Sequence, residues 1–182
     1  MVPHELSTDL VPTADAQKCI VFVAGTRGTS QTWSRRFFAI ATEICVTIRC
    51  HGVLLGGDVG PNTNRLVSWS RFHPLREILP YACAIVHHAG IGTAAAAIEF
   101  GIPQMVIPRI FAQSSNARWL RDLRLAVVMR EHDFCLRRGL EGIDALVRGC
   151  VWRDNARRFA RRCSPQDLRE RLLAFPEHRR GL

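Results

Sequence analysis

The sequence predicts an α/β fold of the Rossmann-like kind, a parallel sheet with helices on both faces. Short runs that are apolar throughout alternate with stretches whose apolar residues recur at helical spacing. Strands that are apolar on both sides need cover on both sides, which is the situation in parallel sheets. The length of 182 residues suffices for one domain with its own core. We expect a single domain over residues 19–182, preceded by an extension over residues 1–18.

Each predicted strand is a short apolar run bounded by glycine, proline or polar turn residues. The predicted strands are residues 19–24, 52–57, 65–70, 83–89, 103–108 and 126–129.

Helices are predicted between the strands by apolar residues at helical spacing. They cover residues 33–48, 75–80, 92–100 and 114–124, with two or three more after residue 129. Thr32 or Ser34 is the expected N-cap of the first helix, and serines are expected to cap the helix at 114–124. Gly101 is expected to end the helix before it in the left-handed conformation.

Composition excludes several classes of protein. No apolar stretch has the length of a membrane span, and the first residues lack the basic start and apolar core of a signal peptide. The seven cysteines are odd in number and form no CxxC pair, so we expect buried thiols in a reducing cytoplasm, with neither disulfides nor a metal site.

The net charge of +9 comes almost entirely from arginine. Such an excess suits a surface for nucleic acid or anionic lipid, or a solvated helical face. No aromatic interleaving or nucleic-acid motif accompanies the arginines, so we favour the solvated face and expect no nucleic-acid partner.

The segment "IVHHAGIGTAAAAIEFGIPQMVIP" carries the candidate site. His87 and His88 end a strand and must point to opposite faces, so one is expected in the core and the other in the crevice at the strand ends. Gly90 and Gly92 allow close backbone approach to a ligand, and the next helix presents free N–H groups beside the Thr93 hydroxyl. These features suit a phosphate or diphosphate, although a tight turn that needs glycine only for packing fits the spacing equally.

Two other phosphate-binding patterns fit less well. The P-loop string does not occur. "GIGTAA" matches the dinucleotide fingerprint, but the following strand ends in Arg109 and Ile110 without the acid that holds a ribose. An NADP-dependent oxidoreductase that uses Arg109 for the 2′-phosphate is therefore a weaker alternative.

The stretch "PYACAIVHHAGIGTAAAAIEFGIPQMVIPRIFAQSSNARWL" closely resembles the donor-binding signature of UDP-glycosyltransferases with the GT-B fold, in the bacterial branch. "CIVFVAGTRGTS" resembles the first strand and turn of their C-terminal half, and "FHPLREILP" resembles the loop around the base. The resemblance covers residues 19–129 and corresponds to the C-terminal domain alone.

The resemblance implies a role for each matching residue. Diphosphate contacts are implied for His88, Gly90, Gly92, Thr93 and Thr26. Phe72 matches an aromatic residue beside the uracil, although a core phenylalanine fits equally, and Gln113 and Asn116 match the "DQxxNA" element near the sugar. A UDP-sugar is thus the implied donor substrate, with no cofactor.

The sequence departs from the family pattern in two places. Ala112 replaces the aspartate of "DQxxNA" and cannot accept hydrogen bonds from sugar hydroxyls, while Ala89 replaces the second glycine of "HHGG". The family also carries its acceptor pocket and catalytic base on an N-terminal domain, and His51, His73 and His132 have no acidic partner apparent in the sequence.

We therefore expect a donor-binding domain that supports hexosyl transfer when joined to an acceptor-binding half, either a missing N-terminal domain or a separate subunit. The alternative is a non-catalytic nucleotide-binding module of the same fold.

Overall fold

The computed structural model describes residues 19–25, 31–57 and 64–162. Six strands form one parallel sheet in the order β3-β2-β1-β4-β5-β6. The strands are β1 (Cys19–Gly25), β2 (Gly52–Gly56), β3 (Val67–Ser70), β4 (Ala82–His87), β5 (Gln104–Val106) and β6 (Ala126–Val128). This order is that of the doubly wound Rossmann fold, so the predicted fold class is confirmed.

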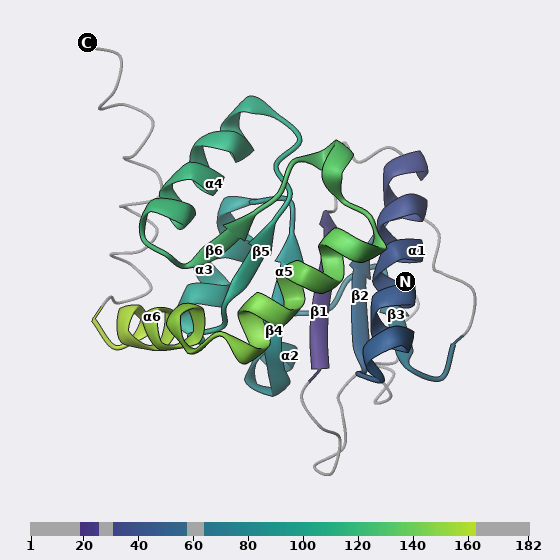
Figure 1. The fold of residues 1–182 in the computed structure, drawn as a ribbon, viewed down its shortest axis with the longest axis horizontal. Helices are drawn as coiled ribbons and strands as arrows, with labels where there is room; N and C mark the ends of the chain where they lie inside the picture. The colour runs from purple at the N-terminus through teal and green to yellow at the C-terminus, as the bar shows by residue number, and fades with distance from the viewer. Residues whose placement is uncertain (1–18, 26–30, 58–63, 163–182) are drawn as a thin grey trace, which may run out of the picture.

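Helices cover both faces of the sheet (Figure 1). They are α1 (Gln31–Ile48), α2 (Leu75–Ile78), α3 (Ile91–Glu99), α4 (Phe111–Asp122), α5 (Leu136–Arg148) and α6 (Cys150–Ala160), with 3-10 turns η2 (Leu79–Tyr81) and η3 (Glu131–Asp133). One core packs β1 against α1 and α5, and a second packs the other face of β1 against α2 and α3. A third core joins α3, α4 and α6 beside β6.

The central strand β1 is covered by helices on both of its faces. Every residue of β1 is buried, and alternate side chains enter the two opposite cores. Phe22 meets Phe37 of α1 edge to face at 6.2 Å, and Phe37 lies 5.5 Å from Phe134. The continuous apolar run seen in the sequence is therefore the middle of the sheet.

The predicted helix starts are wrong at two places. Thr32 and Ser34 both lie inside α1, which begins at Gln31. Helix α4 begins at Phe111, so Ser114 is helical, and Gln113 caps it instead: its side-chain oxygen accepts from the backbone N–H groups of Arg109 at 2.8 Å and of Ile110 at 3.3 Å. A glutamine one turn into the helix performs the role that was assigned to serine.

Gly101 ends α3 as predicted. Its φ of +65° is left-handed, and the N–H of Ile102 reaches back to the carbonyl of Ala97 at 2.9 Å.

The prediction of buried thiols holds for only some of the cysteines. Cys19 and Cys45 are buried and Cys50 and Cys83 half-buried, but Cys135 and Cys150, at the amino ends of α5 and α6, are exposed. Apolar neighbours in sequence did not distinguish a helix start from a helix core. The six cysteines in the described ranges are thiols and not disulfides.

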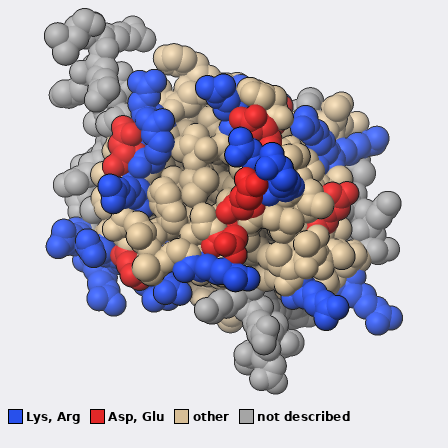
Figure 2. Space-filling model, in the orientation of Figure 1, with Lys and Arg blue, Asp and Glu red and all other residues tan. Residues whose placement is uncertain are grey.

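Arginines and acids alternate on the surface. Figure 2 shows both charges interspersed on the face that carries α1 and α5. On α5, Arg137 lies 3.2 Å from Glu141 and Arg148 lies 2.7 Å from Asp144, at helical i,i+4 spacing. This pairing is typical of a solvated helical face. Among the described helices, none is both long enough and apolar enough to cross a bilayer.

Candidate functional site

The candidate site lies where the strand order reverses, between β1 and β4. Chain connections leave these adjacent strands toward opposite sides of the sheet, which opens a crevice at their carboxyl ends. His87 ends β4, and the turn from His88 to Gly90 leads directly into α3. The residues singled out in the sequence thus lie at the topological switch point.

The two histidines have separate environments, as strand alternation predicted. His87 is fully buried, and its Nε2 lies 2.9 Å from the side-chain oxygen of Gln104 on β5, so Nε2 carries the proton. Burial lowers the pKa of His87 to about 3 and keeps the ring neutral. His88 is half-buried and faces the crevice.

The pKa of His88 is also lowered, chiefly by burial and secondarily by the positive charge of Arg109, while the backbone at Val23 of β1 opposes the shift. Val23 on β1 and Arg109, which follows β5, thus both influence the pKa of this imidazole. A dianionic ligand in this crevice would raise the pKa of His88 and favour its protonated, hydrogen-bond-donating form.

The amino end of α3 presents backbone N–H groups that have no partner within the helix. The first backbone bond of the helix runs from the N–H of Ala94 to the carbonyl of Gly90 at 2.9 Å, and no side chain in the described part of the chain caps the end. The N–H groups of Ile91, Gly92 and Thr93 precede that bond and point out of the helix end. They add to the positive end of the helix dipole, which attracts anions.

The two glycines have different reasons to be there. A Cβ on Gly90 would come within 2.8 Å of Nε2 of His88, so Gly90 leaves room for the imidazole. A Cβ on Gly92 would meet no atom within 4 Å, and Gly92 has no positive φ. The packing explanation therefore fails for Gly92, which lies exposed where a ligand would reach the helix end.

Two side chains of α4 hold the surrounding loops. Asn116 donates from Nδ2 to the carbonyl of Ala89 at 2.9 Å and fixes the turn that follows His88. Gln113 caps α4 through its side-chain oxygen. The oxygen of Asn116 and the amide nitrogen of Gln113 take no part in these bonds. Ala112 is exposed beside them.

Ala89 carries more strain than its sequence position suggested. Its φ of +61° lies in the left-handed region, where a side chain with a Cβ costs roughly 1–2 kcal/mol. The family glycine at this position would adopt the same turn without that cost.

Arg109 is the residue that the sequence reasoning assigned only to the weaker NADP alternative. Its guanidinium carbon lies 4.7 Å from the centre of the Trp33 ring, and its Nε lies 3.4 Å from Oε2 of Glu131. Its charge reaches His88. The position directly after a strand that ends at the crevice was the signal for this residue.

Phe72 is not a core residue. Its side chain is 72% exposed in the loop between β3 and α2, which removes the alternative of a core phenylalanine. Trp69, at the same sheet edge, donates from Nε1 to the carbonyl of Gly56 at 3.0 Å. Thr26, the remaining predicted diphosphate contact, lies outside the described residues.

The expectation that the other histidines lack acidic partners is wrong for two of them. Nε2 of the buried His73 lies 3.1 Å from Glu77, one helical turn ahead, and Nε2 of His132 lies 3.6 Å from Asp133. His51 meets the hydroxyl of Ser68 at 3.3 Å. Within the described ranges, no three histidine, cysteine or acidic side chains gather as metal ligands would.

Comparisons with known proteins agree with this fold. The family model for the erythromycin biosynthesis protein CIII-like C-terminal domain matches residues 36–174. Elloramycin glycosyltransferase of Streptomyces olivaceus is 41% identical over 67 residues, covering 36% of this chain and 17% of that protein. Aclacinomycin-T 2-deoxy-L-fucose transferase of Streptomyces galilaeus is 39% identical over 54 residues, covering 30% and 12%.

Among solved structures, glycosyltransferase VinC in complex with dTDP superposes with a TM-score of 0.71 at 21% identity, over 96% of this chain and 45% of that one. This similarity concerns the fold. The chain spans less than half the length of that structure and under a fifth of the two curated relatives. Because the family model covers most of its length, the chain belongs to the erythromycin biosynthesis protein CIII-like C-terminal domain family and is a C-terminal domain of GT-B glycosyltransferases.

Proposed function

We propose that this domain binds the diphosphate of a UDP-sugar and supports transfer of the hexosyl group when it is joined to an acceptor-binding half. The observation that carries the proposal is the uncapped end of α3, with the open space at Gly92, beside the half-buried imidazole of His88 at the switch point. Backbone N–H groups and an imidazole together suit the charge that develops on a leaving diphosphate.

The proposed roles follow from position. Ile91, Gly92 and Thr93 offer N–H groups to one phosphate, and His88 donates to the other. Gly90 leaves room for the imidazole of His88, because it has no Cβ. Thr26 is proposed to contact the same diphosphate. These donors stabilise negative charge as the bond to the anomeric carbon breaks.

The exposed ring of Phe72 is proposed to stack on the pyrimidine base. An aromatic side chain that is 72% exposed loses water when a base covers it, which favours stacking. Thymine presents the same face as uracil. The complex of VinC with dTDP makes a dTDP-sugar the second candidate donor.

The sugar is proposed to be held by Gln113 and Asn116 without a carboxylate. Ala112 has no acceptor for a hydroxyl, so a sugar that lacks a hydroxyl at that point loses nothing here. One relative is named as a 2-deoxy-L-fucose transferase, which agrees with a donor of low hydroxyl content. We propose a deoxyhexose as the better donor sugar.

The acceptor side is proposed to lie on another domain or chain. In-line attack at the anomeric carbon needs an acceptor hydroxyl held in place and a base that takes its proton. The described crevice supplies only the leaving-group side. We also propose a cytoplasmic location, where a reducing environment would keep the described cysteines as thiols.

Calorimetric titration of the purified chain tests the proposal, with UDP, dTDP and NADP as ligands. His88→Ala should weaken binding of the diphosphate by about 1–3 kcal/mol, the scale of a hydrogen bond to a charged group. Gly92→Leu should abolish binding because the added side chain obstructs the amino end of the helix. The chain should stay folded, because a Cβ at this position meets no atom within 4 Å. His132→Ala, which removes an exposed ring elsewhere, is the control.

Two results would contradict the proposal. If Gly92→Leu lowers the melting temperature and leaves UDP and dTDP affinity unchanged, the glycine serves packing. Binding of NADP alone would favour the oxidoreductase alternative. An assay of sugar transfer by the purified chain should give none, and turnover without a second protein would place a base within this domain.

A further inference from the structure

A cavity lies at the end of the sheet opposite the crevice, at the amino ends of β4 and β5. Its volume is about 270 Å³, and its wall comes from η2, the start of β4, the loop between α3 and β5, and helices α5 and α6. His88 lies at the other end of β4, six residues along a strand, so the two sites are separated by roughly 20 Å. The proposed donor crevice does not include this cavity.

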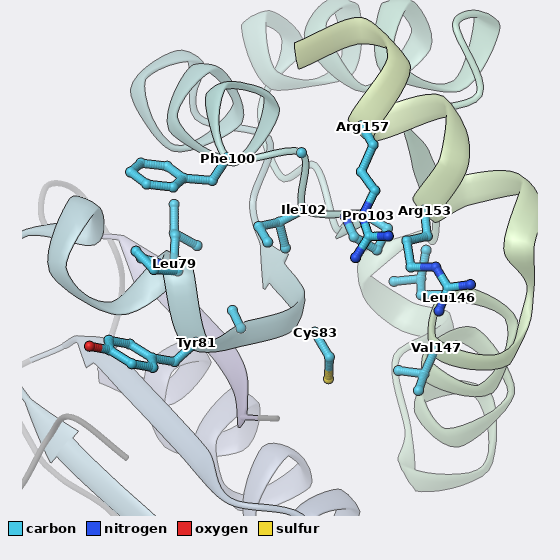
Figure 3. Close-up of a pocket in the computed structure, with 13 residues that line it drawn as sticks. Leu79, Tyr81, Cys83, Phe100, Ile102, Pro103, Leu146, Val147, Arg153 and Arg157 are labelled. Carbon is cyan, nitrogen blue, oxygen red and sulfur yellow. The ribbon is translucent and has the colours of Figure 1, made fainter. Parts of the chain in front are cut away.

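Most of the cavity wall is apolar. Leu79 and Phe100 lie on one side, Ile102 and Pro103 line the middle, and Leu146 of α5 lies near Arg153 (Figure 3). These groups would contact a compact apolar or aromatic body. Among the residues that the structure describes, no acidic side chain lines the cavity.

The remaining wall is cationic. Arg153 and Arg157 stand one turn apart on α6, and both reach from the helix toward the cavity (Figure 3). Within the described ranges, Nε of Arg153 is buried without a hydrogen-bond partner, and a carboxylate oxygen of Asp154 lies 3.9 Å away. Among the described residues, Arg157 forms no ion pair. Two permanent positive charges thus share one cavity wall, and among the described residues the only ion pair that either forms is the 3.9 Å contact of Arg153 with Asp154.

The backbone position of Arg157 is fixed by packing against the turn after α3. A Cβ on Gly101 would lie 3.2 Å from the Cα of Arg157, so the left-handed turn after α3 packs directly against this point of α6. A rigid helix backbone lowers the cost of ordering the side chain on a ligand.

From these observations we propose that the cavity binds a small organic anion, with a carboxylate or phosphate held by Arg153 and Arg157 and an apolar body against Phe100 and Ile102. Guanidinium groups match both oxyanions through paired N–H donors. The apolar wall selects against inorganic anions, which gain nothing from it. The site is separate from the proposed donor crevice and does not depend on it.

Titration of the full chain with benzoate and phenyl phosphate tests this proposal, and benzyl alcohol and benzamidine serve as the neutral and cationic counterparts. Both anions should bind and raise the melting temperature, and the counterparts should not. Arg153→Met and Arg157→Met should each weaken binding by about tenfold or more, because a charge-assisted hydrogen bond is lost. Arg158→Met, on the same helix but outside the cavity wall, is the matched control.

The outcomes distinguish specific binding in the cavity from nonspecific attraction of anions to a positively charged protein. If benzoate alone binds, the site takes carboxylates, and if phenyl phosphate alone binds, it takes phosphate monoesters. The proposal is overturned if neither anion binds, if benzyl alcohol binds equally well, or if Arg158→Met weakens binding as much as the other two variants. Competition by UDP would also overturn it, because the anions would then occupy the donor crevice.

Discussion

The buried imidazole of His87 should make the domain sensitive to mild acid. Its pKa is about 3 in the folded protein, against 6.5 for an ordinary histidine, because burial disfavours the charged ring. Between these two values the unfolded chain takes up a proton that the folded chain refuses. Stability is therefore complete above pH 6.5 and declines as the pH falls from 6.5 toward 3.

The size of this effect follows from the pKa difference. Each pH unit below 6.5 costs about 1.4 kcal/mol, so about 2 kcal/mol is lost by pH 5. That is a substantial part of the 5–15 kcal/mol typical of a domain's stability. The contact with Gln104 at 2.9 Å offsets burial only in part, and Nδ1 of His87 has no hydrogen-bond partner among the residues that the structure describes.

Urea unfolding measured at intervals between pH 7.5 and 5 tests this prediction. Wild type should lose stability more steeply than His87→Gln, and the slopes should differ by about 1.4 kcal/mol per pH unit below pH 6. His132→Gln, which removes a ring whose side chain is 71% exposed, should keep the wild-type slope. The measurement stops at pH 5 because carboxylates titrate below it.

Equal slopes for wild type and His87→Gln would refute the reasoning. Such a result would mean that His87 gains a proton in the folded state, so the ring would have to reach water. The switch-point geometry, in which His87 is in the core and His88 in the crevice, would then be wrong.

Two further changes have defined outcomes. Ala89→Gly should raise the free energy of unfolding by about 1 kcal/mol, because φ is +61° there. As a control, Ala94→Gly inside α3 should lower the free energy of unfolding. No gain in Ala89→Gly would show that the turn is not left-handed. The thiol of Cys83 hydrogen-bonds Cys50 and holds the pKa of Cys50 below its usual range, while the same bond and burial raise the pKa of Cys83. Iodoacetamide at neutral pH should therefore modify Cys50 before Cys83, and Cys83→Ser should slow modification of Cys50; an unchanged rate, read by mass spectrometry, would contradict the contact.

Much of the candidate site could be read from local sequence. Strand alternation separates His87 from His88, and Gly90, Gly92 and Thr93 fall at the start of a helix because the apolar periodicity changes there. These are relations between residues within one turn or one strand, which the chain's own geometry fixes.

Other features of the site needed contacts between distant segments. Arg109 reaches Trp33 and Glu131, and Asn116 holds the carbonyl of Ala89 across 27 residues of sequence. The exposure of Phe72 depends on what packs around its loop, so an apolar letter could not decide it. The caps of α1 and α4 were misplaced because serine and threonine also occur inside helices.

The sequence by itself determined the class of the fold and the edge of the sheet where the phosphate donors gather, because both depend on the periods of strand and helix. Only the tertiary structure decided the strand order that brings β1 beside β4 and so creates the crevice at His88. It alone placed Arg153 and Arg157 over the cavity formed with Phe100 and Ile102. The physical reason is that burial, the pKa of a side chain and the charge around a cavity are set by neighbours distant in sequence, and folding alone brings those neighbours together.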